Sequence, residues 1–144
     1  GQKTFAELAA QYSISEIVQV SNYIPREHIV PLMHLSSIML VLTTSAKLHD
    51  THGIMGTKFY EILGIEKPCL CLTSDEECLA HAIQKTHAGL AATNVEEVKA
   101  FILEKYQEWL QNGFTRQAVI NKEQFSRQKQ AQQFEQLFIE TLKH

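Results

Sequence analysis

Short apolar runs alternate with amphipathic stretches along the middle of the chain, and this alternation predicts strands separated by helices. The two most apolar runs are 37–43, which reads SIMLVLT, and 69–72, which reads CLCL. A nearly unbroken apolar run is typical of a strand buried on both faces, as in a parallel sheet covered by helices. Weaker strand candidates lie at 17–20 and 89–92. The pattern therefore predicts an α/β fold with an open parallel sheet of about four strands.

Helices are predicted where apolar side chains recur at three- and four-residue spacing. The expected helices cover residues 3–12, 26–35, 54–65, 75–86, 95–110 and most of the Gln-rich stretch 115–144. Capping residues support several of these ends: Thr4 with Glu7 forms a capping-box pattern, and Asn94 precedes the fifth helix. Either Ser74 or Asp75 is expected to cap the fourth. The stretch 115–144 is interpreted as a C-terminal helical extension.

Composition and charge narrow the class of protein. The chain has 144 residues, 44% hydrophobic and 20% charged, so one globular domain over 1–144 is expected. The formal net charge of -3 gives no basic field for nucleic acid, and no apolar run reaches the roughly 20 residues of a membrane-spanning helix. Three cysteines, two of them in an apolar run, fit buried thiols in a reducing compartment. We therefore expect a cytoplasmic protein, either free or peripheral at the inner membrane face, without a nucleic-acid partner.

The stretch HGIMGTKFYEIL at 52–63 carries the strongest functional signal. It follows the run 37–43, and open parallel sheets bind ligands at the carboxyl ends of their strands. Gly53 and Gly56 lack a Cβ, so a ligand can approach their backbone closely. The helix that starts here offers unpaired N–H groups and a partial positive charge, which suit a phosphate group.

Three polar side chains at this helix start extend the same hypothesis. Thr57 can donate a hydroxyl hydrogen bond, and Lys58 adds a positive charge. Glu61 lies four residues after Thr57 and therefore faces the same side of the helix, where a carboxylate can accept two hydrogen bonds from a sugar diol. The alternative is purely structural: Thr57 caps the helix, and Lys58 forms a solvated pair with Glu61. The residue pattern by itself leaves both interpretations open.

The order of motifs resembles the C-terminal, nucleotide-sugar-binding half of GT-B glycosyltransferases. The resemblance covers roughly residues 5–110 and is carried by YIP at 23–25, KFYEILG at 58–64 and KPCL at 67–70. It implies a partial Rossmann-like domain of the GT-B type that binds a nucleotide-diphosphate sugar. Within that domain it implies that Glu61 binds the ribose diol and that Tyr23 and Ile24 lie at the turn near the base. Gly53 stands where many family members carry a first glutamate, so retention or inversion of the sugar is left open.

The resemblance also implies that the chain is the donor-binding part of a longer glycosyltransferase. The acceptor-binding domain would precede it, and the isolated chain is expected to bind a donor without transferring the sugar. The acceptor would be a growing cell-surface polysaccharide or a lipid-linked sugar, as in polysaccharide biosynthesis. Two alternatives remain: a nucleotide-sugar epimerase of the same fold, and a non-catalytic α/β ligand-binding module.

Other residues with metal-binding chemistry are interpreted differently. The loop candidates are His49, Asp50 and His52, and a second set is Cys69, Cys71, Cys78 and His81. The first set is expected to lie near the donor, because GT-B enzymes generally use no bound catalytic metal. In the second set, the first two thiols share one face of an apolar strand, which favours core packing over zinc. We therefore expect neither a metal nor a cofactor, with the nucleotide sugar acting as substrate.

The aromatic side chains of the last two predicted helices are expected to pack in the core. They are Trp109, Phe134 and Phe138. If the partner of these helices lies in another part of a longer protein, their apolar faces would instead be exposed. Exposed faces of this kind favour self-association of the chain.

Overall fold

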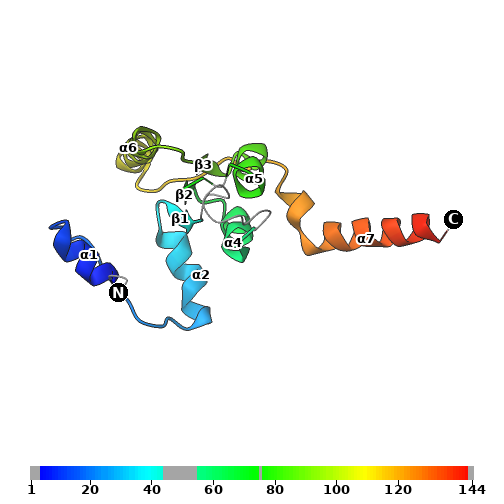
Figure 1. The fold of residues 1–144 in the computed structure, drawn as a ribbon, viewed down its shortest axis with the longest axis horizontal. Helices are drawn as coiled ribbons and strands as arrows, with labels where there is room; N and C mark the ends of the chain where they lie inside the picture. The colour runs from blue at the N-terminus through cyan, green and yellow to red at the C-terminus, as the bar shows by residue number, and fades with distance from the viewer. Residues whose placement is uncertain (1–3, 44–54, 75, 143–144) are drawn as a thin grey trace. The chain divides into compact units, whose positions relative to one another are not determined.

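Helices alternate with parallel strands from Met39 to Asn112 (Figure 1). The computed structural model describes residues 4–43, 55–74 and 76–142. The chain divides into two units, Gly1–Leu32 and Met33–His144, and each is described by itself. The fold of the second unit is α/β with a parallel sheet, as the hydrophobic pattern predicts.

The first unit contains helix α1, Phe5–Gln11, and most of helix α2, Arg26–Leu35. The predicted capping box is confirmed, because the Glu7 N–H donates to Thr4 Oγ1 at 3.2 Å and the Thr4 N–H donates to Glu7 Oε2 at 2.7 Å. The predicted strand at 17–20 is wrong. These residues form a turn followed by irregular chain, and Ile17 is 82% exposed. A short β-branched stretch forms a strand only when another strand pairs with it, and no described residue pairs with this one.

The sheet of the second unit has three strands: β1 Met39–Leu42, β2 Cys69–Leu72 and β3 Gly89–Ala91. Their order is β1-β2-β3, and both pairings are parallel, with Met39 and Gly89 each opposite Cys69. Among the described residues the sheet therefore has three strands, and the predicted fourth is absent.

One face of the sheet is well packed. Helices α4, Thr57–Ile65, and α5, Cys78–Thr86, lie on one side of the sheet in Figure 1, and helix α6, Val95–Asn112, lies on the other. The core includes Phe59, Ile62, Cys69, Cys71, Leu79 and Ile83, each no more than 1% exposed. Burying side chains of this size contributes about 1.5–3 kcal/mol each to folding, so this layer holds α4 and α5 in place.

The expectation that 37–43 is buried on both faces is wrong for β1. Val41 points into the core and is 6% exposed, whereas Leu40 and Leu42 on the other face are 50% and 63% exposed. Alternate residues of a strand face opposite sides of the sheet, so β1 is packed on one face only. Central strand β2 differs, because Leu70 is buried as well as its flanking cysteines.

Helix α6 buries a charged residue instead of the predicted aromatic one. Its start and end agree with the sequence, since the Asn94 side chain accepts from the Glu97 N–H and Gly113 ends the helix at a positive φ of 75°. Trp109, however, is 43% exposed and stacks on Tyr106, while Lys105 is only 7% exposed. Lys105 Nζ is paired with Glu104 at 3.0 Å and with Glu108 at 3.1 Å, which compensates for the loss of hydration.

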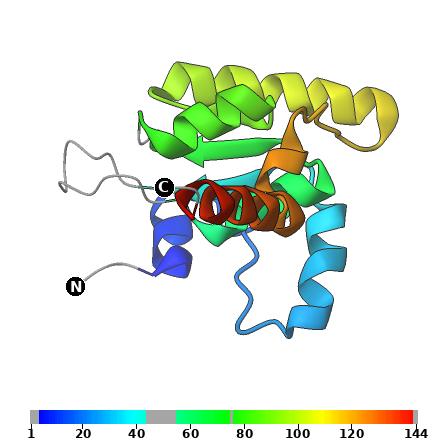
Figure 2. The same cartoon turned by 90° about the vertical axis from the view of Figure 1, so that its right-hand side faces the viewer.

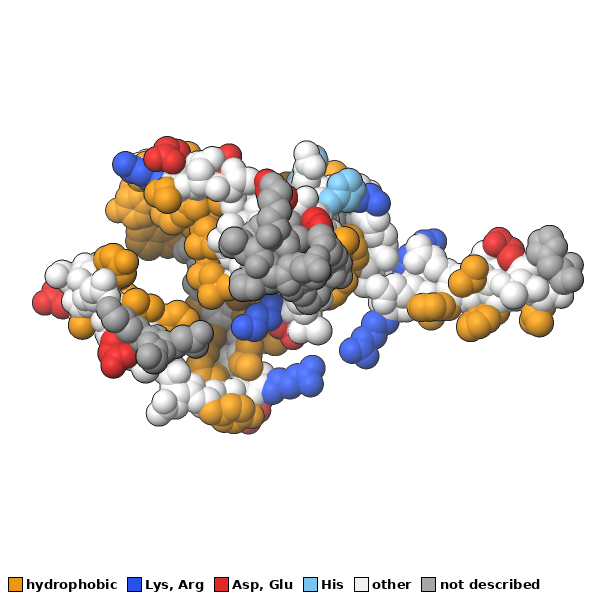
Figure 3. All heavy atoms as spheres, viewed as in Figure 1, with side chains coloured by type: hydrophobic (Ala, Val, Ile, Leu, Met, Phe, Trp, Pro, Cys, Tyr) orange, Lys and Arg blue, Asp and Glu red, His pale blue; other side chains and the backbone are white. Residues whose placement is uncertain are grey.

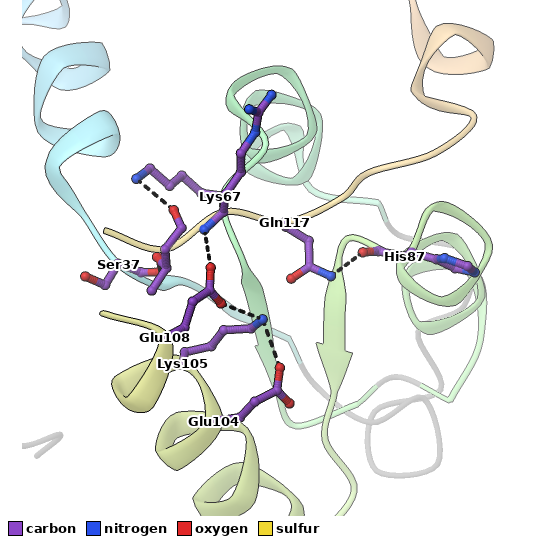
Figure 4. A network of polar contacts seen from close by, with 9 residues as sticks. Ser37, Lys67, His87, Glu104, Lys105, Glu108 and Gln117 are labelled. Carbon is purple, nitrogen blue, oxygen red and sulfur yellow. Dashed lines mark hydrogen bonds and ion pairs between the residues drawn. The ribbon is translucent and has the colours of Figure 1, made fainter. Parts of the chain in front are cut away.

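The segment 115–121 is not helical, which corrects the prediction for the start of the C-terminal extension. Hydrogen bonds fix it as irregular chain (Figure 4). The Thr115 hydroxyl donates to the Ser37 carbonyl, Lys67 Nζ donates to the Thr115 carbonyl at 3.4 Å, and the Gln117 amide donates to the His87 carbonyl at 2.6 Å. Ser37, Lys67 and His87 each lie two residues before one of the three strands. The bonds therefore hold the segment along the amino edge of the sheet, where a continuing helix could not reach all three partners.

The chain becomes helical again further on, in the 3₁₀-helix η1, Lys122–Phe125, and in helix α7, Arg127–Thr141. The predicted stripe of α7 is present but is not buried. Phe134 and Phe138 are 62% and 64% exposed, and hydrophobic side chains are visible along α7 in Figure 3. The expectation that they belong to the core is therefore wrong.

Candidate anion site at the start of helix α4

Helix α4 begins on the side of the sheet where ligands bind in folds of this class. It follows β1 in the chain and precedes β2, which is parallel to β1. In such a crossover the helix runs antiparallel to its strands, so its N-terminus lies at the carboxyl edge of the sheet. Figure 2, turned by 90° from Figure 1, shows helix α6 (yellow) running above the strands. Four of the predicted residues, Gly53, His49, Asp50 and His52, lie outside the described residues.

The backbone at the start of α4 is open to a ligand. Gly56 is the N-cap residue, in extended conformation at φ −67° and ψ 141°, and no side chain caps the helix. The Phe59 N–H donates to the Gly56 carbonyl at 3.1 Å, which leaves the N–H groups of Thr57 and Lys58 as the first donors of the helix. Among the described residues, no heavy atom would lie within 4 Å of a Cβ on Gly56, so the described part of the chain leaves the space beside this backbone open.

The starts of three other helices are closed by their own side chains. Thr4 with Glu7 closes α1, Asn94 accepts from the Glu97 N–H at α6, and Ser126 accepts from the Lys129 N–H at α7. The first turn of α4 contains neither such a cap nor an acidic residue. Its N-terminal dipole, equivalent to about half a positive charge, is therefore available to an anion.

The predicted polar side chains of α4 are all on its exposed side. Thr57, Lys58 and Glu61 are exposed, whereas Phe59 and Ile62 are buried in the core and fix the helix on the sheet. The hypothesis that Thr57 caps the helix is wrong, because Thr57 is the first helical residue and Gly56 is the cap. No ion pair between Lys58 and Glu61 occurs within the described residues.

The structure brings together only part of the predicted site. Gly56, Thr57, Lys58 and Glu61 form one helix start. Tyr23 and Ile24 belong to the first unit, where Tyr23 is 89% exposed and Ile24 is half-buried. Their suggested role beside the base of a nucleotide is therefore a separate hypothesis from the anion site on α4.

A row of threonines at the carboxyl edge was missed by the sequence interpretation. Thr43, Thr73 and Thr93 each come one or two residues after one of the three strands. The Thr93 hydroxyl already donates to Glu97 Oε2 at 3.1 Å, whereas Thr73 is exposed. A hollow of about 340 Å³ adjoins Thr73 and Thr93. The signal was in the sequence, because a hydroxyl residue after each apolar run places three hydroxyl groups along one edge of a parallel sheet.

Cys69 and Cys71 pack in the core, as predicted for these two thiols. Cys69 and Cys71 are buried, and Cys78 is exposed. Burial raises the pKa of the Cys69 thiol to about 12, so the thiol stays protonated and unreactive at neutral pH. Within the described ranges no group of three His, Cys, Asp or Glu side chains could hold a metal ion.

Comparison of the chain with protein-family models, with curated proteins and with solved structures gave no match. No described helix combines the length and the hydropathy that crossing a membrane requires.

Proposed function

We propose that the start of α4 binds the diphosphate of a nucleotide-diphosphate sugar, and that the chain is the donor-binding portion of a glycosyltransferase. The observation that carries this proposal is the open N-terminus of α4 at the carboxyl edge of a parallel sheet. The motif resemblance to the GT-B donor-binding half points to the same residues.

Each group at the helix start has a role in this proposal. The N–H groups of Thr57 and Lys58 donate to phosphate oxygens, and the Thr57 hydroxyl and the Lys58 ammonium add a further donor and a positive charge. Glu61, one turn further along the same side, accepts hydrogen bonds from the ribose diol. Gly56 keeps the approach to the backbone free, since a side chain there would occupy the empty space beside it.

The same contacts explain how this portion would assist sugar transfer. When the bond between the sugar and the diphosphate breaks, negative charge grows on the leaving phosphate oxygen. Oriented N–H donors and a helix dipole stabilise that charge without reorganising. In this proposal the acceptor, a saccharide or a lipid-linked sugar, is bound by a further domain of the same protein.

Calorimetric titration of the full chain with UDP, GDP and ADP tests the proposal. We expect at least one of these nucleotides to bind. Glu61→Ala should weaken that binding at least about tenfold, which corresponds to the loss of one charged hydrogen bond. Gly56→Val is expected to weaken binding as much or more. The Cβ of this valine meets no described heavy atom within 4 Å, and its side chain occupies the path of the phosphate.

Matched substitutions separate the site from general effects of charge. Glu135 is an exposed acid on α7 and Lys99 is an exposed lysine on α6, so Glu135→Ala and Lys99→Ala should bind the nucleotide as the unchanged chain does. Lys58→Ala should weaken it. If none of the three nucleotides binds, or if Glu61→Ala and Glu135→Ala behave alike, the proposed donor site is wrong.

A further inference from the structure

A candidate binding surface lies along the outer edge of β3, which is the edge strand at the other end of the sheet from β1. A groove of about 460 Å³ separates this edge from the outer side of α5. The strand side is formed by Gly89, Leu90 and Ala91, and the helix side by Ala80, His81 and Gln84. Because β3 is the last strand in the order β1-β2-β3, the groove is bordered by a strand that has, among the described residues, a neighbouring strand on one side only.

The backbone groups that point into this groove can be assigned from the ladder. Cys69 N–H donates to the Ala88 carbonyl at 2.9 Å, and Ala92 N–H donates to the Cys71 carbonyl at 3.0 Å. Backbone groups of successive strand residues point to opposite sides, so the N–H and C=O of Gly89 and of Ala91 point away from β2. Within the described residues, no hydrogen bond uses these four groups.

The next backbone N–H that points away from β2, that of Thr93, already has a hydrogen-bond partner. Thr93 N–H donates to Glu97 Oε2 at 2.8 Å, which ends the available edge two residues after Ala91. The open edge thus offers two donors and two acceptors at the spacing of an extended chain. A strand is the ligand that matches this spacing, because its own N–H and C=O groups alternate in the same way.

The side chains that line the groove also indicate which charge a bound peptide strand should carry. Glu76 and Glu77 line its end near the carboxyl terminus of β3, and the described residues of its lining include no lysine or arginine. Glu97 adds a third carboxylate near this end, since it accepts from Thr93, which also lines the groove. A peptide with a basic side chain at this end is therefore favoured over an acidic one.

From this geometry we propose that the groove between β3 and α5 binds an extended peptide segment, which adds to the sheet at Gly89–Ala91 and places a basic residue beside Glu76 and Glu77. This binding site is separate from the proposed donor site, since it lies on another strand and uses another helix. Either proposal can fail without the other.

NMR titration with a synthetic probe tests this inference on the full chain. The probe is Ac-Lys-Thr-Val-Thr-Val-Lys-NH₂, which carries lysine at both ends and so fits either strand direction. The amides of Gly89 and Ala91 are expected to shift and to exchange more slowly with solvent when the probe is added. A probe with glutamate in place of both lysines should bind about tenfold more weakly.

Two controls isolate backbone pairing from unspecific adhesion. A probe N-methylated at alternate residues cannot donate to the edge, so it should not protect these amides. Ala91→Pro removes one outward N–H without touching the ladder and should weaken binding about tenfold. Leu40→Pro removes an N–H of β1 that also faces away from β2 and should leave probe binding unchanged. Absent shifts at Gly89 and Ala91, or equal binding of the methylated probe, would overturn the proposal.

Discussion

At the scale of single residues, two glycines illustrate different uses of a missing side chain. Gly89 has a φ of +151°, and a Cβ on it would overlap the backbone of Cys69. The close contact between β3 and β2 therefore requires glycine at this position. Gly56 has neither restriction, since its φ is −67° and no described heavy atom lies within 4 Å of its Cβ position. Its lack of a side chain is not required by the fold, which is consistent with a role in binding.

Gly89→Ala should destabilise the protein strongly. The new methyl group forces β3 away from β2 and holds an L-residue at an unfavourable φ, at a cost of about 2–4 kcal/mol. Urea unfolding followed by circular dichroism measures this loss. Gly64→Ala is the matched control, because Gly64 lies in α4 with no atom near its Cβ position. The control should raise stability by up to about 1 kcal/mol, and equal stability of the two variants would contradict the packing described for β3.

At the scale of elements, the sequence pattern predicted most helices and the buried strands. Strand 69–72 and the ends of α6 were predicted correctly, because a continuous apolar run and strong capping residues are local signals. The strand at 17–20 was not, since strand formation depends on a neighbour that the local pattern does not reveal. The predicted start of α5 was too early: Ser74 Oγ accepts from the Glu76 N–H at 3.0 Å, and the helix begins only at Cys78.

The candidate site and the packing of α6 were predictable only in part, because tertiary contacts are not visible in the local sequence pattern. The start of α4 was recognisable from Gly56, Thr57 and Lys58, which follow the apolar run 37–43. The exposure of Trp109 and the burial of Lys105 could not be read from helical spacing. Both depend on where α6 crosses the sheet and on the carboxylates that surround the ammonium group.

The C-terminal end of α4 provides a prediction about pH. Glu66 ends the helix in the left-handed region and accepts from Lys122 Nζ at 2.7 Å and from Arg116 Nη2 at 2.8 Å. Hydrogen bonds from Lys122 and Arg116 lower the pKa of Glu66 from its ordinary 4.5 to about 2. A carboxyl group with a depressed pKa stabilises the fold above its unfolded pKa. This contribution should therefore be complete above about pH 4.5 and disappear as the pH falls towards 2.

Unfolding of the chain and of Glu66→Gln across this pH range measures the effect. The variant should be less stable above pH 4.5, and the difference should shrink on acidification and at high salt. In a background of Arg116→Gln with Lys122→Gln, Glu66→Gln should have little further effect. A stability difference that does not change with pH would contradict the ionic role of Glu66.

At the scale of the whole molecule, much apolar surface is exposed. On α7 it is formed by Phe134, Leu137, Phe138 and Leu142, each more than half exposed. On α6 it includes the stacked pair Tyr106 and Trp109. Exposed apolar surface of this extent is typical of regions that bind other proteins or a further part of the same protein.

We expect the isolated chain to self-associate with rising concentration, and sedimentation velocity measures this directly. Phe134→Ser combined with Phe138→Ser should reduce the association, because it removes the centre of the α7 stripe. Lys129→Ser combined with Gln136→Ser changes the opposite side of the same helix, as the angle of about 100° per residue dictates, and should leave association unchanged. Identical sedimentation of both double variants would exclude α7 as the associating surface.

The most direct test of the central claim is to locate the bound nucleotide on the backbone. An amide NMR titration of the full chain with the best-binding nucleoside diphosphate should shift the N–H signals of Thr57 and Lys58 most. The start of α6 is an internal control, because the Asn94 side chain already accepts from the Glu97 N–H there. Shifts centred on Thr57 and Lys58 would support the donor site. Shifts of equal size at the start of α6, or none at α4, would contradict it.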